Sequence, residues 1–260
     1  MKLATWNVNS LRVRLSQLEQ WLATVQPDVL CLQETKVRDS DFPVQAFSAL
    51  GYEVVYHGQP SYNGVAIAAR GALTDVRIGL EGFADEQCRT IAASYQGLRV
   101  ASLYVPNGTA IDSPRYPYKL EWLRALHAQS AHWLSSNPAL VLAGDFNIAP
   151  EDEDVYDPKA WEGSVLVSAP ERAAFRELIA VGFTDALRVI GGKGCGFSWW
   201  DYRAGAFRRD QGLRIDHILL STSLAGHCQV CYVDRDARGH PRPSDHAPVV
   251  AEIPWPVPAA

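Results

Sequence analysis

Short apolar runs, separated by helical and polar segments, constrain the fold of this chain most strongly. Each run spans four to seven residues and most are rich in β-branched side chains, which is typical of buried strands. The runs are Leu3–Trp6, Val29–Leu32, Val65–Ala69, Val100–Val105, Leu140–Ala143, Ile215–Leu220 and Ala247–Ile253. Strands of this kind need helices or a second sheet to cover their faces.

Helical periodicity fills some of the gaps between these runs. Apolar residues recur every three or four positions over residues 11–25, with Asn9 or Ser10 as the N-cap, and again over 120–134. A third pattern over 175–182 ends in a glycine, a common helix stop. Strands that alternate with helices predict a layered α/β domain, and the strand order stays open.

The composition fits one globular domain. A chain of 260 residues that is 47% hydrophobic and 20% charged can bury a sizeable core, which excludes a disordered protein. No internal repeat and no linker rich in glycine and serine divides it. We expect a single domain over residues 1–254 and a short proline-rich tail over 255–260.

The sequence also bears on location. It has no apolar signal-peptide region and no apolar run of about 18 residues that could span a membrane. Five scattered cysteines, an odd number, indicate a reduced and cytoplasmic protein. Cys228 and Cys231 have CxxC spacing, but no second such pair completes a zinc site, so we interpret them as thiols of a strand.

The net charge gives a weak first indication about partners. A formal charge of −5 is unusual for a nucleic-acid-binding protein, whose domains are commonly basic. Five acids and no base lie in residues 151–157, so this segment alone equals the whole net charge. The rest of the chain is therefore neutral overall and can still carry local basic patches.

Polar residues interrupt the apolar runs at their ends, where sites gather in open sheets. Five strand termini present an amide, an acid or a histidine: Trp6–Asn9, Gln33–Lys36, Gly144–Asn147, Arg214–His217 and Ser244–Pro248. Carboxylates and amides are hard oxygen ligands that suit Mg²⁺ or Mn²⁺ rather than zinc. A histidine with an orienting acid, such as His246 with Asp216, can act as a general acid or base or stabilise charge on a phosphate. These parts suit metal-assisted hydrolysis of a phosphoester.

Each part alone has a simpler structural explanation. Glu34 could be a solvated loop residue, Gly144–Asn147 an Asx turn, and Ser244–Pro248 a helix cap or turn. Asp216 is harder to dismiss, because a carboxylate within an apolar strand needs a partner. The joint occurrence of all five segments favours a functional site.

Seven segments together resemble the exonuclease III family of apurinic/apyrimidinic (AP) endonucleases, within the endonuclease/exonuclease/phosphatase superfamily. They are Trp6–Arg12, Leu32–Lys36, Tyr104–Gly108, Gly144–Pro150, Phe197–Arg203, Gly212–Asp216 and Ser244–Pro248. The resemblance implies a deoxyribonuclease I-like four-layer α/β sandwich, with two packed mixed sheets flanked by helices. It also implies Mg²⁺ or Mn²⁺ as cofactor and, as partner, double-stranded DNA with abasic sites or 3′ ends. The implied reaction is hydrolysis on the 5′ side of abasic sites in base-excision repair, with 3′→5′ exonuclease and 3′-phosphodiesterase activity, by a protein we expect to be a monomer.

The resemblance also implies roles for individual residues. Glu34 is similar to the main metal ligand, with Asn7, Asn9 and Asp245 nearby as direct or water-mediated partners. Asn9 stands where some relatives carry aspartate, which removes one metal-binding charge.

The catalytic roles carry over in the same way. Asp145 resembles the residue that activates the attacking water, and Asn147 the amide that positions water or phosphate; both are also candidate metal ligands. His246, oriented by Asp216, resembles the imidazole at the scissile phosphate, and Tyr104 the phenol that contacts it.

The expected substrate contacts lie around these residues. Asn107 resembles a phosphate contact, and Lys36 is expected to touch the DNA backbone or the carboxylates. Trp199, Leu213 and Ile215 match the apolar wall of an abasic-sugar pocket, since a flipped sugar without a base needs an apolar slot.

Arginines supply the expected DNA-binding charge. Arg203, Arg208, Arg209 and Arg214 form a candidate basic patch for phosphate contacts, and we expect the acidic segment 151–157 to lie away from it. Two alternatives stay open: a phosphoesterase of this superfamily with a non-DNA substrate such as an inositol phosphate or sphingolipid, and an inactive relative that only binds nucleic acid.

Overall fold

The computed structural model describes residues 1–191 and 196–256. Its strands are β1 Lys2–Asn7, β2 Val29–Gln33, β3 Glu53–His57, β4 Val65–Ala69, β5 Leu73–Ile78, β6 Thr90–Tyr95, β7 Leu98–Tyr104, β8 Leu140–Asp145, β9 Phe183–Asp185, β10 Trp199–Trp200, β11 Gly212–Leu213, β12 Asp216–Ser221, β13 Val230–Val233 and β14 Val249–Glu252. Its α-helices are α1 Leu11–Val25, α2 Val44–Ser48, α3 Arg115–Ser136, α4 Pro158–Trp161, α5 Ala169–Ala180, α6 Ala186–Val189 and α7 Thr222–Ala225. Short 3₁₀ turns cover Asp39–Asp41, Asp152–Asp154, Arg203–Gly205 and Arg235–Gly239.

Two six-stranded sheets form the centre of the molecule. Their strand orders are β13-β14-β1-β2-β4-β3 and β5-β6-β7-β8-β12-β9. In each sheet one central pair is parallel, β1 with β2 and β7 with β8, and the other pairs are antiparallel. Both sheets are therefore mixed, as the resemblance implied.

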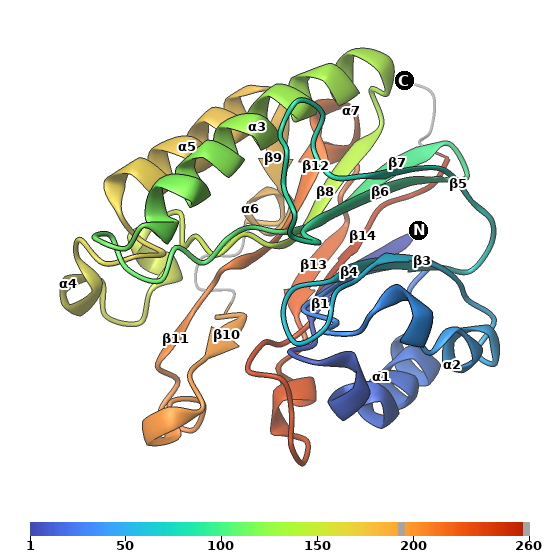
Figure 1. Cartoon of the computed structure of the whole chain (residues 1–260), viewed down its shortest axis with the longest axis horizontal. Coiled ribbons are helices and arrows are strands. Elements are labelled where there is room, and N and C mark those ends of the chain that lie inside the picture. The colour runs from blue at the N-terminus through green and yellow to red at the C-terminus, as the bar shows by residue number, and fades with distance from the viewer. Residues whose placement is uncertain (192–195, 257–260) are drawn as a thin grey trace.

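The two sheets pack face to face, with helices on their outer faces (Figure 1). Alternate side chains of both sheets, such as Val29, Ile67 and Ile218, share one buried cluster. On the outer face of the first sheet, Leu18 and Trp21 of α1 fill a second cluster. Trp122 of α3 and Phe175 of α5 fill a third against the other sheet. The predicted four-layer α/β sandwich is confirmed.

The predicted helices and strands agree with the structure in place and differ at their ends. Helix α1 begins at Leu11 after Ser10, whose side chain makes no cap hydrogen bond. The helix expected over 175–182 begins earlier, at Ala169, after a capping box of Ser168 and Glu171. Cys195 and residues 257–260 of the expected tail lie outside the described residues. Within the described ranges, no helix has the length and apolar character to cross a membrane.

Candidate active site

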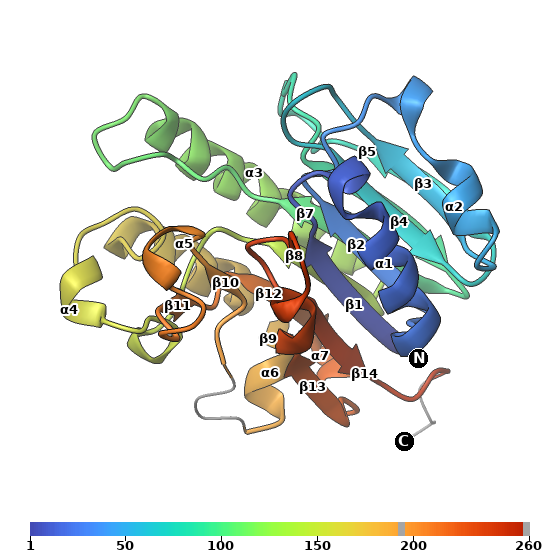
Figure 2. The same cartoon turned by 90° about the horizontal axis from the view of Figure 1, so that it is seen from below.

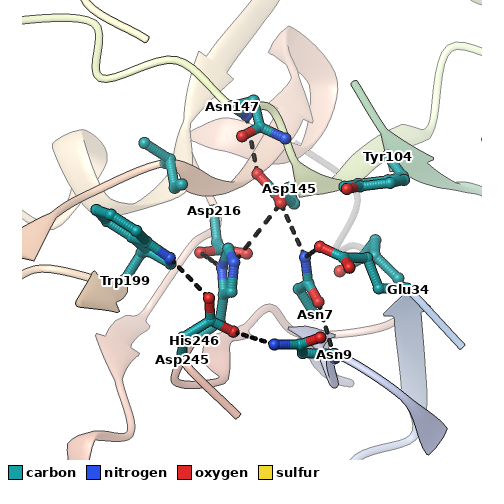
Figure 3. Close-up of polar contacts among 12 residues, drawn as sticks. Asn7, Asn9, Glu34, Tyr104, Asp145, Asn147, Trp199, Asp216, Asp245 and His246 are labelled. Carbon is teal, nitrogen blue, oxygen red and sulfur yellow. Dashed lines mark hydrogen bonds and ion pairs between the residues drawn. The ribbon is translucent and has the colours of Figure 1, made fainter. Parts of the chain in front are cut away.

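Strand register brings acids from distant parts of the chain together at one end of the sandwich. Asp145 at the end of β8 lies opposite Asp216 at the start of β12 and opposite Tyr104 at the end of β7. Gly144 allows the close approach of β7, because a Cβ there would lie 1.9 Å from the carbonyl oxygen of Leu103. The end of β1 in the other sheet supplies Asn7 (Figure 3).

Asp145 lies at the centre of this group and is 1% exposed. Its Oδ2 accepts a hydrogen bond from Asn7 Nδ2 at 2.9 Å, and its Oδ1 accepts one from the backbone N–H of Asn147 at 2.8 Å. His246 Nε2 lies 3.8 Å from Asp145 Oδ2. The carboxylate is thus held in one orientation, with an imidazole facing it.

Glu34 and its neighbours form the side of the site next to the first sheet. Asn7 Nδ2 donates to Glu34 Oε1 at 2.8 Å, and Lys36 Nζ lies 2.8 Å from Glu34 Oε2. Lys36 also donates to Asn9 Oδ1 at 2.6 Å. Lys36 therefore contacts a carboxylate, one of the two contacts expected for it.

His246 is oriented by Asp216 from the opposite side. Its Nδ1 lies 2.8 Å from Asp216 Oδ2, which also accepts a hydrogen bond from Ser198 Oγ at 2.6 Å. The Ser198 hydroxyl must donate to Asp216, because it accepts the backbone N–H groups of residues 215 and 216. Burial lowers the pKa of His246, but Asp216 and Asp145 outweigh burial and raise it well above its ordinary value. The imidazole is therefore positively charged at neutral pH.

The donor set fits a divalent cation. One carboxylate oxygen of Glu34, one of Asp145 and a ring nitrogen of His246 lie within 4.8 Å of one another, and because the imidazole is protonated, the two carboxylates are the candidate ligands of this group. Burial raises the pKa of Asp145; the His246 charge partly offsets this, and Asp216 and Glu34 add to the rise. Carboxylate oxygens that converge in a buried site favour a hard cation, which would offset their mutual repulsion.

Two loops bring asparagines to the same cluster. Asn107 Nδ2 donates to Asn147 Oδ1 at 2.9 Å, and Asn147 Nδ2 donates to the carbonyl of Val105 at 3.0 Å. Asn147 has a positive φ of 49°, which directs its backbone N–H to Asp145. Burial raises the pKa of the Tyr104 phenol well above its ordinary value, and the charges of Glu34 and Asp145 add to this. Tyr104 is thus a neutral hydroxyl beside the acids.

Asp245 and Trp199 lie at the edge of the cluster (Figure 3). Asp245 Oδ1 accepts from Asn9 Nδ2 at 2.9 Å, and its Oδ2 accepts from Trp199 Nε1 at 3.0 Å. Asp245 is therefore outside the close group of metal-ligating atoms. Leu213 and Ile215 are buried in one cluster, on which the partly exposed Trp199 packs. The indole is the member of this predicted wall that reaches the surface.

The basic patch differs from the expectation. Arg203, Arg208 and Arg209 are exposed on the loop between β10 and β11, at the same end of the molecule as α4 (Figures 1 and 2). Arg214 is buried and therefore does not belong to an exposed patch, which corrects the expected patch of four arginines. Its guanidinium binds Asp154 Oδ1 at 2.6 Å and Asp185 Oδ2 at 2.6 Å.

The acidic segment 151–157 lies beside residues 212–214, so the expectation that it lies apart was wrong. Its Asp154 is buried between Arg214 and Arg188, and Val155 bridges to Leu213. Other acids of the segment pair with Arg188 and Arg172. These arginines neutralise much of the charge, which explains how the segment packs there. The contact argues against a DNA path over residues 212–214 and leaves the three exposed arginines as predicted contacts.

Replacing Asp185 with asparagine tests this buried network. Burial would raise the pKa of Asp185, but Arg214 and His217 lower it below its ordinary value. The ionised carboxylate therefore stabilises the fold above pH 4 or so, and this stabilisation is lost as the pH falls through the lower, folded pKa. We expect Asp185→Asn to lower the free energy of unfolding by about 3 kcal/mol at pH 7, because Arg214 loses a buried partner.

Urea denaturation at pH 7 and pH 3 measures the difference. The loss should be smaller at pH 3. Asp152→Asn is the control, because its exposed pair with Arg172 is worth at most about 1 kcal/mol. Equal unfolding midpoints of Asp185→Asn and the wild type at pH 7 would contradict a stabilising network.

Sequence reasoning missed several groups around the site. Ser198 lies within a quoted motif, yet a single serine before a strand carries no signal for its bond to Asp216. A surface pocket lined by Tyr104 and Asn107 also contains Arg89 and Arg115, which stand in no motif. Only the fold brings these arginines beside the site.

Comparison with known proteins agrees with this geometry. The model of the Endonuclease/Exonuclease/phosphatase family matches residues 4–246. The chain is 37% identical to exodeoxyribonuclease III of Haemophilus influenzae, with 97% of this chain and 100% of that protein covered.

Two solved structures are similar over almost the whole chain. A variant of the 3′ phosphatase NExo from Neisseria, bound to a product DNA hairpin, is 46% identical with a TM-score of 0.96; 98% of this chain and 100% of that chain are covered. An AP endonuclease from Archaeoglobus fulgidus is 40% identical with a TM-score of 0.92, over 97% of this chain and 99% of that chain.

Proposed function

The chain belongs to the exonuclease III family of DNA repair nucleases, and from this premise we propose that it incises DNA 5′ to abasic sites and hydrolyses phosphoesters at 3′ ends, as a 3′→5′ exonuclease and 3′-phosphodiesterase. The observation that carries the chemistry is the convergence of Glu34, Asp145 and His246 at one end of the two sheets. Both proposed reactions hydrolyse a phosphoester of DNA. One catalytic group can therefore serve both.

Asp145 is the proposed general base. Its carboxylate is buried at the centre of the site and faces the His246 imidazole, and a carboxylate within hydrogen-bond reach of a water can take the water's proton. The hydrogen bonds from Asn7 and Asn147 fix the orientation of the carboxylate, beside which we propose that the attacking water binds. Asp145 holds that water and takes its proton.

His246 is the proposed stabiliser of transition-state charge. Asp216 keeps the imidazole protonated and fixes Nδ1–H, so Nε2–H is free to donate to a phosphate oxygen. The neutral Tyr104 hydroxyl and the Asn107 amide are proposed to hold the remaining phosphate oxygens. A divalent cation at Glu34 and Asp145, proposed to be Mg²⁺ or Mn²⁺, would supply electrostatic stabilisation of the charge on the phosphate.

The DNA contacts are proposed around this centre. Arg203, Arg208 and Arg209 are exposed cations that suit the DNA backbone. Trp199 offers a partly exposed apolar ring next to Asp245, on which a sugar without a base can pack. The similar Neisseria protein was solved with a DNA hairpin, which supports DNA as the partner.

A substrate panel tests this function. Duplexes with one abasic site, a 3′-phosphate or a recessed 3′-hydroxyl are incubated with Mg²⁺, Mn²⁺ or EDTA, alongside an inositol phosphate. We expect turnover of the DNA substrates only with the divalent ions, and none of the inositol phosphate. If none of the three DNA substrates is hydrolysed with either Mg²⁺ or Mn²⁺, the proposal is refuted.

Action on 3′ ends alone is the second candidate. It is favoured because Leu213 and Ile215 are buried in one cluster with Val155, Leu166 and Val167, so that of the predicted sugar-pocket wall only Trp199 is partly exposed. The similar 3′ phosphatase supports the same alternative. In the panel it predicts release of 3′-phosphate while the abasic duplex stays intact.

A further inference from the structure

A fully buried lysine lies beneath the two asparagine loops. Lys119 of α3 and Glu171 of α5 are both 0% exposed, and their side chains form an ion pair. Burial lowers the pKa of Lys119, while the charge of Glu171 acts in the opposite direction. Charged side chains are almost never buried so completely without a specific arrangement of partners.

The other bonds of the ammonium group reach the catalytic end of the molecule. Lys119 Nζ donates to the carbonyl oxygen of Asn147 at 2.6 Å and to that of Asn107 at 3.2 Å. With the bond to Glu171, all three N–H groups have an acceptor. One ammonium group thus joins the loop after β7 to the loop after β8.

Glu171 is itself held in place. Its Oε1 accepts the backbone N–H of Leu166 at 3.0 Å, and its Oε2 accepts that of Ser168 at 3.1 Å. The lysine stem also packs closely below Gly108, where a Cβ would lie 3.2 Å from Lys119 Cδ. The anchor is therefore rigid.

We propose that Lys119 is a positioning residue, whose buried ammonium group fixes the two loops that carry Asn107 and Asn147. The backbone of Asn147 has a positive φ, and the Lys119 bond to its carbonyl holds it there. The N–H of the same residue then points to Asp145 Oδ1. Lys119 orients the general base through Asn147, without touching substrate.

This inference rests on the proposed phosphoester hydrolysis, so the wild type is first assayed on 3′-phosphate and abasic duplexes. Lys119→Met keeps the apolar stem and removes the ammonium group. We expect kcat to fall about 100-fold with KM changed less than about 3-fold, because small misplacement of catalytic groups is costly in rate. Lys119→Met/Glu171→Gln is the second variant, since it leaves no unpaired buried carboxylate.

Arg99→Met is the matched control. Arg99 is a buried cation bonded to a carboxylate and a carbonyl of Asp75, on the same sheet but at the far end of β7. The Arg99→Met variant should be less stable than the wild type and keep kcat within about 2-fold of it, because Arg99 shares no partner with the site.

A double-mutant cycle separates positioning from a structural role. If Lys119 acts by orienting Asp145, Lys119→Met should add less than about 2-fold to the loss caused by Asp145→Asn. A folded Lys119 variant with wild-type kcat, or fully additive losses, would overturn the inference. An inactive wild type would instead refute the proposed function.

Discussion

Asp145→Asn is expected to lower kcat on abasic and 3′-phosphate DNA by about 10³-fold, within the range of a lost general base. Asparagine keeps the shape and one acceptor, but it cannot take a proton from water. Single-turnover cleavage with saturating Mg²⁺ measures the loss in the chemical step.

The fold should tolerate this change. Ionised Asp145 costs stability in the absence of metal, because its folded pKa is raised. This cost grows as the pH rises from the pKa of Asp145 in the unfolded chain to its higher pKa in the folded protein. The melting temperature of Asp145→Asn in EDTA at pH 8 should therefore be no lower than that of the wild type. Asp234→Asn is the control, since that carboxylate accepts a hydrogen bond from Trp21 outside the site. Rates of Asp145→Asn within a few-fold of the wild type would remove Asp145 as the base.

Asp216→Asn is expected to lower kcat by about 10²- to 10³-fold, which is the usual effect of losing one group that stabilises transition-state charge. The carboxylate raises the pKa of His246, so its loss lowers that pKa. The imidazole should then lose its proton at a lower pH, so the alkaline limb of the pH–rate profile should shift to lower pH. Rates from pH 6 to pH 10 measure this shift.

His246→Gln provides the comparison for Asp216. Because Asp216 acts through the imidazole, kcat of the double variant Asp216→Asn/His246→Gln should lie within about 2-fold of kcat of His246→Gln alone. A pH profile of Asp216→Asn that coincides with that of the wild type would show that Asp216 does not control the charge of His246.

Strands with a continuous apolar run could be predicted from the sequence, whereas the buried strand β6, which contains Thr90 and Ser94, and the exposed or very short strands could not. The runs that became β2, β4 and β8 are apolar throughout, because both of their faces are covered. Strand β5 has exposed residues along most of its length, and β10 and β11 have two residues each. Short or solvated strands lack the continuous apolar signal, so none of these was predicted.

The candidate site shows the same limit. Polar residues at strand ends indicated Asn7, Glu34, Asp145 and His246, because strand ends meet at one edge. The burial of Arg214 could not be predicted, because the order of charged residues in a sequence does not distinguish a buried ion pair from an exposed cation. The segment 151–157 likewise looked like a repulsive loop until its arginine partners were placed beside it.

The pairing of β14 with β1 has a consequence for synthesis of the protein. Ser244 Oγ donates to the carbonyl of Asn7, and β14 aligns with β1 in antiparallel register. Asp145 therefore faces His246 only after β14, the strand that follows His246, has left the ribosome and paired with β1. A nascent chain that has emerged only as far as β13 holds most of the carboxylates and no imidazole at the centre. Chains truncated before His246 are therefore expected to leave DNA intact.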